Sequence, residues 1–278
     1  MLETLFTSEL EVIEKHLRAQ LRTSFACPLP QLERFWQSME YSLHSGGKRF
    51  RPLLSVLTAK ALGRSEETVM DLAIAVEMIH TYSLIHDDLP CMDNDDMRRG
   101  KPTNHKVYGE AGALLAGDAL LTLAFGVLTQ KPSLTVAQTV SLLSEAAGPR
   151  GMVGGQVMDV ELSHPEESIL AEVHARKTGC LIRVSVEGAA VLCEATAEER
   201  QNLRAYGEFL GLAFQLADDL EDYNPARPEK ISFVSLLGPE TVQAKLFDAS
   251  TSALNLLDGF GENAEGLRNM VRMNRDRV

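Results

Sequence analysis

The stretch that decides the fold runs from Leu84 to Thr103 and reads LIHDDLPCMDNDDMRRGKPT. It follows an apolar run and holds five aspartates and two adjacent arginines, Arg98 and Arg99. Carboxylate oxygens are the ligands that a hard cation such as Mg²⁺ prefers. Neighbouring arginines offer a diphosphate forked, charge-assisted hydrogen bonds. The stretch therefore predicts a site for a metal-bound diphosphate at the end of a helix.

A second acidic cluster, FQLADDLED, lies far downstream at Phe214 to Asp222. On a helix, Asp218 and Asp222 stand one above the other, because residues four apart share a face. Like charges at this spacing destabilise an isolated helix by about 0.3 kcal/mol, and a cation between them removes that cost. One such motif alone is more typical of a solvated acidic face. Two clusters, each at the end of an apolar helix, favour a metal site.

Six motifs in order give the chain a resemblance to a known family. They are GGKRFRP (Gly46 to Pro52), HTYSLIHDDLPCMDNDDMRRGKPTNH (His80 to His105), AGDALL (Ala116 to Leu121), GGQVMD (Gly154 to Asp159), KTG (Lys177 to Gly179) and FQLADDLED. From about residue 45 to residue 238 the sequence resembles the trans-isoprenyl diphosphate synthases, most closely the bacterial farnesyl diphosphate synthases. The resemblance implies the isoprenoid synthase fold, an all-α bundle of about ten or more helices around a central cavity, with residues 1–278 as a single domain.

The resemblance also implies an activity. It is the Mg²⁺-dependent, head-to-tail condensation of isopentenyl diphosphate with dimethylallyl or geranyl diphosphate, which yields C15 farnesyl diphosphate. Three Mg²⁺ ions, with Mn²⁺ as a substitute, would neutralise the leaving diphosphate. The metal ligands carried over are Asp87, Asp88, Asp93, Asp218 and Asp222, and Asp219 and Lys177 join them as catalytic residues. The absence of a Ser-His-Asp or Cys-His pattern agrees with this activity, because the condensation needs no side-chain nucleophile.

Two diphosphate sites follow from the same resemblance. GGKRFRP combines glycines, which let a ligand approach the backbone, with cations before a helix that we expect to begin at Pro52. On its residues alone this is an ordinary basic turn. The family assigns isopentenyl diphosphate to Lys48, Arg51, His80 and Arg99, and the allylic diphosphate to Arg98, Lys177, Thr178, Gln215 and Lys230.

Tyr82 and Ser83 are the residues that we expect to limit product length. They lie five and four residues before Asp87, about one helical turn of 5.4 Å below the first cluster. A bulky Tyr82 there would close the floor of the cavity, and in the family an aromatic residue at this place accompanies a C15 product. The simpler interpretation is that Tyr82 packs in the core.

Composition excludes several other classes of protein. The net charge of −12 argues against nucleic acid or an anionic membrane as a partner. The acidic N-terminal residues do not resemble a signal peptide, and we expect no membrane span. The four cysteines lack metal-ligand spacing, which favours reduced thiols in a cytoplasmic protein. A homodimer is expected from the family.

Hydrophobic periodicity and capping signals predict the helices. The helix over residues 112–130 is apolar nearly all round, so we expect it to be buried, with Asp118 as a satisfied buried acid. Thr196 and Glu199 should form a capping box. A basic tail at residues 272–277 is expected to fold over the site. The expected helices are residues 9–22, 31–43, 52–62, a long one from about 65 to 87, 112–130, 135–146, 151–162, 166–193, 197–223, 240–257 and 265–275.

The sequence departs from the family after the second cluster. Only YNPARPEK separates Asp222 from ISFVSLLG, where relatives carry a longer, lysine-bearing loop. Lys230 takes the place of the final lysine, and Arg227 is the candidate for the other. Three alternatives stay open: a terpene cyclase, against which GGKRFRP speaks, a C20 geranylgeranyl diphosphate synthase, and a non-catalytic relative. The short loop favours the last of these, whereas the two complete acid clusters oppose it.

Overall fold

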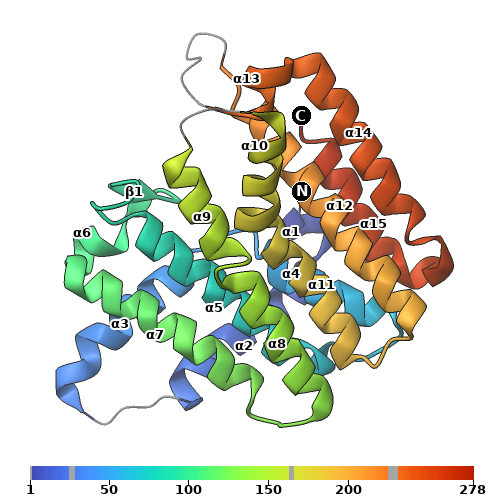
Figure 1. Cartoon of the computed structure of the whole chain (residues 1–278). Helices are drawn as coiled ribbons and strands as arrows, with labels where there is room; N and C mark the ends of the chain where they lie inside the picture. The colour runs from blue at the N-terminus through green and yellow to red at the C-terminus, as the bar shows by residue number, and fades with distance from the viewer. Residues whose placement is uncertain (1, 25–28, 163–165, 225–230) are drawn as a thin grey trace. The chain divides into compact units, whose positions relative to one another are not determined.

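The computed structural model describes residues 2–24, 29–162, 166–224 and 231–278 (Figure 1). In this described part the regular secondary structure is helical, apart from the two short strands β1 (Met97–Arg98) and β2 (Lys101–Pro102), so the all-α prediction is confirmed. Backbone contacts divide the chain into two compact units. Unit 1 is Met1–Leu53 with Met70–Ser133, and unit 2 is Leu54–Val69 with Leu134–Val278. The single domain stays a prediction.

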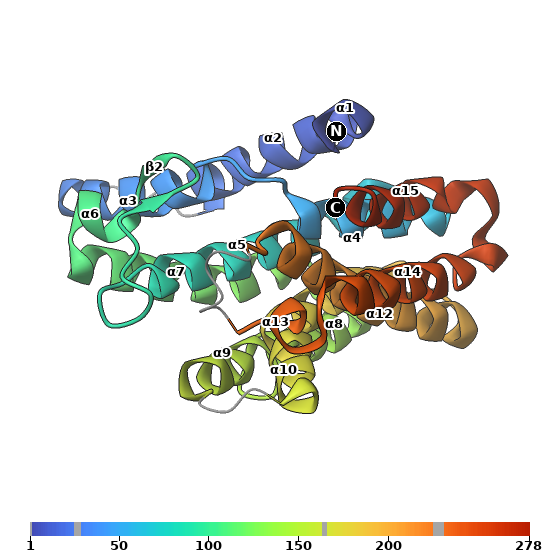
Figure 2. The same ribbon diagram turned by 90° about the horizontal axis from the view of Figure 1, so that it is seen from above.

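Unit 1 is built around helix α5 (Met70–Asp87), which packs most extensively against α7 (Glu110–Leu128). Most residues of α5 are buried, including Glu77, as is expected of a helix that is apolar on every side. Figure 2 shows α5 and α7 running side by side. The remaining helices of the unit are α1 (Leu2–Leu5), α2 (Thr7–Ser24), η1 (Pro30–Leu32), α3 (Glu33–Leu43), the first residues of α4 (Phe50–Ala61) and α6 (Asn104–Tyr108).

Helix α7 differs from the prediction of a fully buried helix. One face lies on α5, but Leu114 and Leu115 are 46% and 56% exposed. The side chain of Asp118 is 60% exposed, so it is not the buried acid that we expected. Composition reports how apolar a helix is and not how many partners cover it. Among the described helices, α7 is also the one long and apolar enough to cross a membrane by length and composition, where no such stretch was expected.

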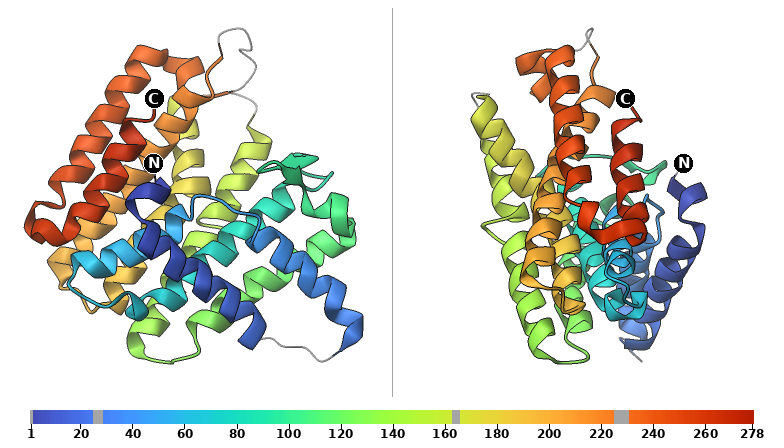
Figure 3. Two further views of the ribbon diagram at one scale, coloured as in Figure 1. Left: turned by 180° about the vertical axis from the view of Figure 1, so that it is seen from behind. Right: turned by 90° about the vertical axis from the view of Figure 1, so that its right-hand side faces the viewer.

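Unit 2 is built around helix α12 (Ala197–Glu221), which packs against α11 (Cys180–Leu192) and α14 (Pro239–Asn255). Figure 3 shows α12, α14 and α15 (Glu265–Arg275) as three neighbouring helices. The buried phenol of Tyr206 donates to the Leu267 carbonyl at 2.9 Å and joins α12 to α15. The other elements of the unit are η2 (Glu66–Thr68), α8 (Leu134–Ala147), α9 (Met152–Glu161), α10 (Glu167–His174), η3 (Ala175–Gly179), α13 (Phe233–Leu237) and η4 (Asp258–Ala264).

Most of the predicted helix boundaries are confirmed to within a few residues. The capping box of Thr196 and Glu199 is present at the start of α12. Helix α4 begins at Phe50 and not at Pro52, so the proline occupies the first turn, where its missing N–H leaves no bond unmade. The helix expected over 166–193 is interrupted by η3, a single π-helical turn between α10 and α11.

Candidate functional site

The first acid cluster lies where α5 ends. Asp87 is half-buried, Asp88 is 3% exposed, and Asp93 is exposed. Because Pro90 cannot continue the helix, the chain turns, and the Asp93 amide donates to the Asp87 carbonyl at 2.8 Å. This bond returns Asp93 to the end of the helix that carries the other two carboxylates.

Arg98 holds the buried carboxylate of this cluster. Its Nε and Nη2 atoms both lie 2.6 Å from Oδ1 of Asp88, and Nη2 lies 3.5 Å from Asp95. Burial raises the pKa of Asp88, and the hydrogen bond from Arg98 acts in the opposite direction. The structure therefore brings together a predicted metal ligand and a predicted diphosphate-binding arginine.

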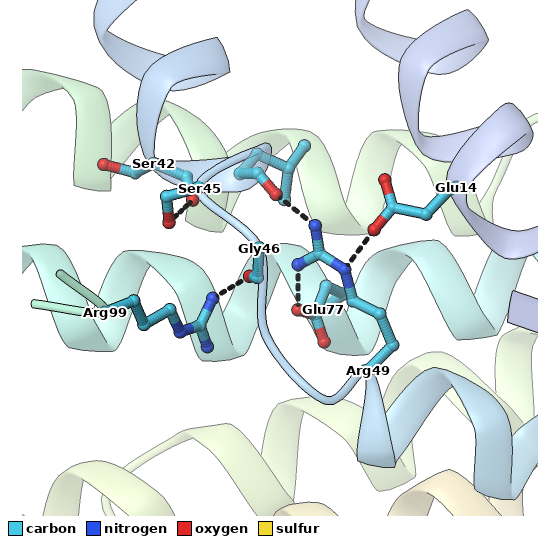
Figure 4. A network of polar contacts seen from close by, with 8 residues as sticks. Glu14, Ser42, Ser45, Gly46, Arg49, Glu77 and Arg99 are labelled. Carbon is cyan, nitrogen blue, oxygen red and sulfur yellow. Dashed lines mark hydrogen bonds and ion pairs between the residues drawn. The ribbon is translucent and has the colours of Figure 1, made fainter. Parts of the chain in front are cut away.

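Arg99 reaches the glycine-rich loop from a tight hairpin. Arg99 and Gly100, with φ of +52° and +75°, connect β1 to β2, and both central residues of a type I′ hairpin turn need positive φ. The Arg99 guanidinium donates to the Gly46 carbonyl and occupies the space beside Gly47, where a Cβ would lie 2.5 Å from Nη1 (Figure 4). Gly47 is therefore required for this contact. Lys48, the next residue, is exposed.

His80, on α5, lies in a cationic environment. Burial first, and then the charges of Arg51, Arg99, Arg98 and Arg49, lower the pKa of His80 well below its ordinary value of 6.5. The imidazole is consequently neutral at pH 7. The predicted isopentenyl diphosphate residues Arg51, His80 and Arg99 thus act on one another electrostatically within unit 1, as an anion site requires.

Tyr82 is buried on α5, and its ring meets the edge of His86 at 5.7 Å between centroids. Burial, with a smaller effect of Asp87, raises the pKa of Tyr82 to about 12, so its phenol stays protonated. His86 Nε2 lies 3.0 Å from the Leu114 carbonyl, in a space that exists because Gly117 of α7 has no side chain. Ser83 Oγ donates to the carbonyl of residue 80, one turn earlier, at 2.9 Å.

The second acid cluster lies at the end of α12 in unit 2. Asp219 is 6% exposed and accepts a 2.7 Å hydrogen bond from the Phe233 amide, so it anchors the start of α13. Asp218 is half-buried and pairs with Arg277. Arg277 also lies 2.6 Å from Glu221 and covers the ring of Phe214 at 5.0 Å. The expected contact of the basic tail is confirmed for Arg277. Asp222 is exposed, and Gln215 is half-buried one turn before Asp219.

Lys177 and Thr178 lie on the π turn η3, and turns of this kind are frequent at functional sites. Lys177 Nζ lies 2.6 Å from Oδ2 of Asp159 on α9. Helix α9 and η3 can pack this closely because Gly155 has no side chain. A Cβ on Gly155 would lie 2.3 Å from the Lys177 amide nitrogen. Lys230 and Arg227 lie outside the described residues.

Comparison with known proteins supplies the family. The polyprenyl synthetase sequence model matches residues 33–231, which is well over half of the 278 residues. This chain belongs to the polyprenyl synthetase family. It is 43% identical to the farnesyl diphosphate synthase of Bacillus subtilis over 80% of this chain and 82% of that one. A geranylgeranyl pyrophosphate synthase of Capsicum annuum is 38% identical over 92% of this chain and 74% of that one.

A solved relative shares the fold of this polyprenyl synthetase. The FPP/GFPP synthase of Zymomonas mobilis superposes with a TM-score of 0.90 at 35% identity, covering 98% of this chain and 99% of that one. The isoprenoid synthase fold expected from the motifs is therefore confirmed.

The carboxylates of this polyprenyl synthetase fit Mg²⁺ in donor chemistry, because every candidate ligand offers hard oxygens. Within the described residues, no group of three or more His, Cys, Asp or Glu side chains is gathered closely enough to hold a metal ion. Asp88 and Asp218, one from each cluster, have an arginine as their cationic partner in this structure. A metal would take the place of these arginines or share the carboxylates with them.

Sequence reasoning missed three features of the site. The hairpin that presents Arg99 is too short for any periodic signal, although RRG at Arg98 to Gly100 is a turn signal. The π turn under Lys177 has no sequence signature that we recognise. The third feature, the burial of Arg49 in the middle of a basic motif, depends on acids from distant helices.

Proposed function

We propose that this polyprenyl synthetase is a Mg²⁺-dependent prenyltransferase that condenses isopentenyl diphosphate with dimethylallyl or geranyl diphosphate to give farnesyl diphosphate. The observation that carries the proposal is the cationic site of unit 1. Arg99 is fixed against the Gly46–Gly47 loop, and both Arg99 and Arg51 act on His80. A protein that only ionises an allylic diphosphate has no use for this second anion site, which supports chain elongation over cyclisation.

In the proposed mechanism, Lys48, Arg51, His80 and Arg99 bind the diphosphate of isopentenyl diphosphate. Arg98, Lys177, Thr178, Gln215 and Lys230 bind the allylic diphosphate, whose carbon–oxygen bond ionises. Asp87, Asp88, Asp93, Asp218 and Asp222 would hold Mg²⁺, which would supply positive charge to neutralise the leaving diphosphate. The double bond of isopentenyl diphosphate attacks the allylic cation, and the adduct loses a proton to the released diphosphate. Apolar walls exclude water, which would quench the cation.

A C20 geranylgeranyl product is the second candidate, because a plant geranylgeranyl pyrophosphate synthase is 38% identical over 92% of this chain. Tyr82 separates the two proposals. The ring of Tyr82 is buried and packs against His86, so it would close the floor of the cavity, and this favours the C15 product.

We further propose a cytoplasmic homodimer. The exposed leucines of α7, Leu114 and Leu115, are the support for self-association, because a second copy would remove them from water.

Product analysis tests the proposed function. Purified protein with Mg²⁺ and isopentenyl diphosphate is given dimethylallyl or geranyl diphosphate, and product length is read by mass spectrometry. We expect C15. Asp87→Ala should abolish turnover and leave the circular dichroism spectrum unchanged, while Asp96→Asn, at an exposed aspartate paired with Lys106, should remain active. Retained activity in Asp87→Ala would contradict the metal assignment.

A further inference from the structure

Arg49 occupies the middle of GGKRFRP and points into unit 1. It is 3% exposed. Its Nε and Nη1 atoms each lie 2.6 Å from a carboxylate, Glu14 of α2 and Glu77 of α5, and Nη2 donates to the Leu43 carbonyl at 2.7 Å. Figure 4 shows the guanidinium enclosed by these three acceptors. All three nitrogens of Arg49 are therefore committed to the protein.

The backbone conformation of Arg49 is one that the turn itself does not favour for an arginine. Its φ is +46°, in the left-handed region that favours glycine or asparagine over an arginine. A buried charge also costs free energy unless it is paired and hydrogen-bonded. Glu14 and Glu77 supply that pairing and raise the pKa of Arg49 in spite of its burial. The contacts of the guanidinium hold a backbone conformation that the sequence would not adopt locally.

The same loop is held from its other side by Arg99, which donates to the Gly46 carbonyl and fills the space beside Gly47. Lys48 lies between Gly47 and Arg49 and is exposed. Arg51 follows in the first turn of α4 and is half-buried. Because Arg49 is neutralised by two carboxylates, the positive charge that remains in GGKRFRP comes from Lys48 and Arg51. Arg99 and Arg49 therefore differ in role. Arg99 is exposed to solvent and can reach a ligand, whereas Arg49 is buried.

We propose that Arg49, clamped by Glu14 and Glu77, is a positioning residue. It fixes the loop that carries Lys48 and leads into Arg51, in the first turn of α4, for binding the diphosphate of isopentenyl diphosphate. This inference rests on the proposed function. Arg49 touches no substrate and acts through the backbone of residues 46–49. Loss of the Arg49 contacts should therefore weaken the binding of isopentenyl diphosphate and leave the binding of the allylic diphosphate nearly unchanged.

The test compares Arg49→Lys, Glu77→Gln and Glu14→Gln with the wild type. We expect the KM for isopentenyl diphosphate to rise about tenfold or more in Arg49→Lys and Glu77→Gln, with the KM for geranyl diphosphate changed by less than about threefold. Glu14, which is partly exposed, should have a smaller effect. Calorimetric titration with isopentenyl diphosphate should show the same weakening. The matched control is Arg34→Lys, at an exposed arginine of α3 that donates to the Val107 carbonyl at 3.0 Å, and it should behave as the wild type.

The outcomes separate this inference from the proposed function. A purely structural role would lower the melting temperature and raise both KM values together, and that result overturns the inference. Unchanged KM values in Arg49→Lys and Glu77→Gln overturn it as well. If Arg49→Lys fails to fold, Glu14→Gln and Glu77→Gln carry the comparison. A wild type that makes no product and binds no isopentenyl diphosphate overturns the proposed function, and this inference with it.

Discussion

At the scale of single residues, His80 is a neutral group held among cations. Its lowered pKa means that the folded protein resists protonating it, whereas the unfolded chain takes up a proton near pH 6.5. Stability should therefore fall as the pH drops from about 6.5 toward the lower folded pKa, because the unfolded state binds more protons there. Above pH 6.5 both states are neutral at this residue, and the effect disappears.

We predict that binding isopentenyl diphosphate at pH 6 is accompanied by proton uptake at His80. Burial is the largest cause of the lowered pKa of His80 and remains in the complex, but the bound diphosphate offsets the charges of Arg51 and Arg99, so this pKa rises from its lowered value. Calorimetry in two buffers of different ionisation enthalpy measures the uptake, since the apparent binding enthalpy then depends on the buffer. His80→Gln should remove this dependence. The same buffer dependence in that variant would assign the proton to another group.

At Tyr82, we predict that size and not the hydroxyl limits the product. Tyr82→Phe should keep the C15 product, because the phenol, with a pKa of about 12, is never ionised under assay conditions. Tyr82→Ala should extend the product to C20 or longer, because it removes the ring that lies against His86. Mass spectrometry of the products distinguishes the two variants. A C15 product from Tyr82→Ala would mean that the floor lies elsewhere.

At the scale of elements, the packing of α5 on α7 depends on a missing side chain. A Cβ on Gly117 would lie 2.1 Å from His86 Nε2, so Gly117→Ala forces the imidazole away from the Leu114 carbonyl and from Tyr82. We expect the free energy of unfolding to fall by about 2 kcal/mol. Gly126→Ala on the same helix, where nothing lies within 4 Å, should raise it by about 0.5 kcal/mol. Urea denaturation measures both, and equal effects would refute the packing argument.

The contact between the chain end after α15 and α12 should compete with a metal at the second cluster. Arg277 forms an ion pair with Asp218, so Arg277→Gln should increase the affinity for Mg²⁺ in the absence of substrate by about threefold. The rise of the melting temperature with Mg²⁺ concentration reports this affinity without turnover. Arg275→Gln is the control, because Arg275 pairs with Asp276 and lies over Phe247. No difference between the two variants would mean that Arg277 and the metal do not compete.

At the scale of the whole molecule, self-association would cover the exposed face of α7. We predict that Leu115→Glu, at a residue 56% exposed, converts the proposed dimer to a monomer in sedimentation equilibrium. Val160→Glu on α9, at a residue 66% exposed, should leave the dimer intact. A wild type that sediments as a monomer at micromolar concentration would contradict the homodimer.

How much of the site was predictable depended on whether the signal was local. Asp87 and Asp88 lie at the end of a helix just before Pro90, and Thr196 and Glu199 form a capping box, so short-range patterns were enough to predict their positions at helix ends. The arginine partners of the two acid clusters were not predictable. That Arg98 pairs with Asp88 within one motif, and Arg277 with Asp218 across 59 positions, depends on how the helices pack.

By itself, the sequence determined the family, the order of the helices and the kind of chemistry, because motifs of acids, cations and glycines are local arrangements of functional groups. Only the tertiary structure decided which member of each motif is available to a ligand. Family resemblance assigned Lys48 and Arg51 to the ligand without a reason for omitting Arg49, and the structure supplies that reason. Arg49 is buried because Glu14 and Glu77 approach it from two other helices. The apolar helix α7 is half-covered for the same reason, since burial depends on the neighbours that the fold provides and not on the composition of the segment.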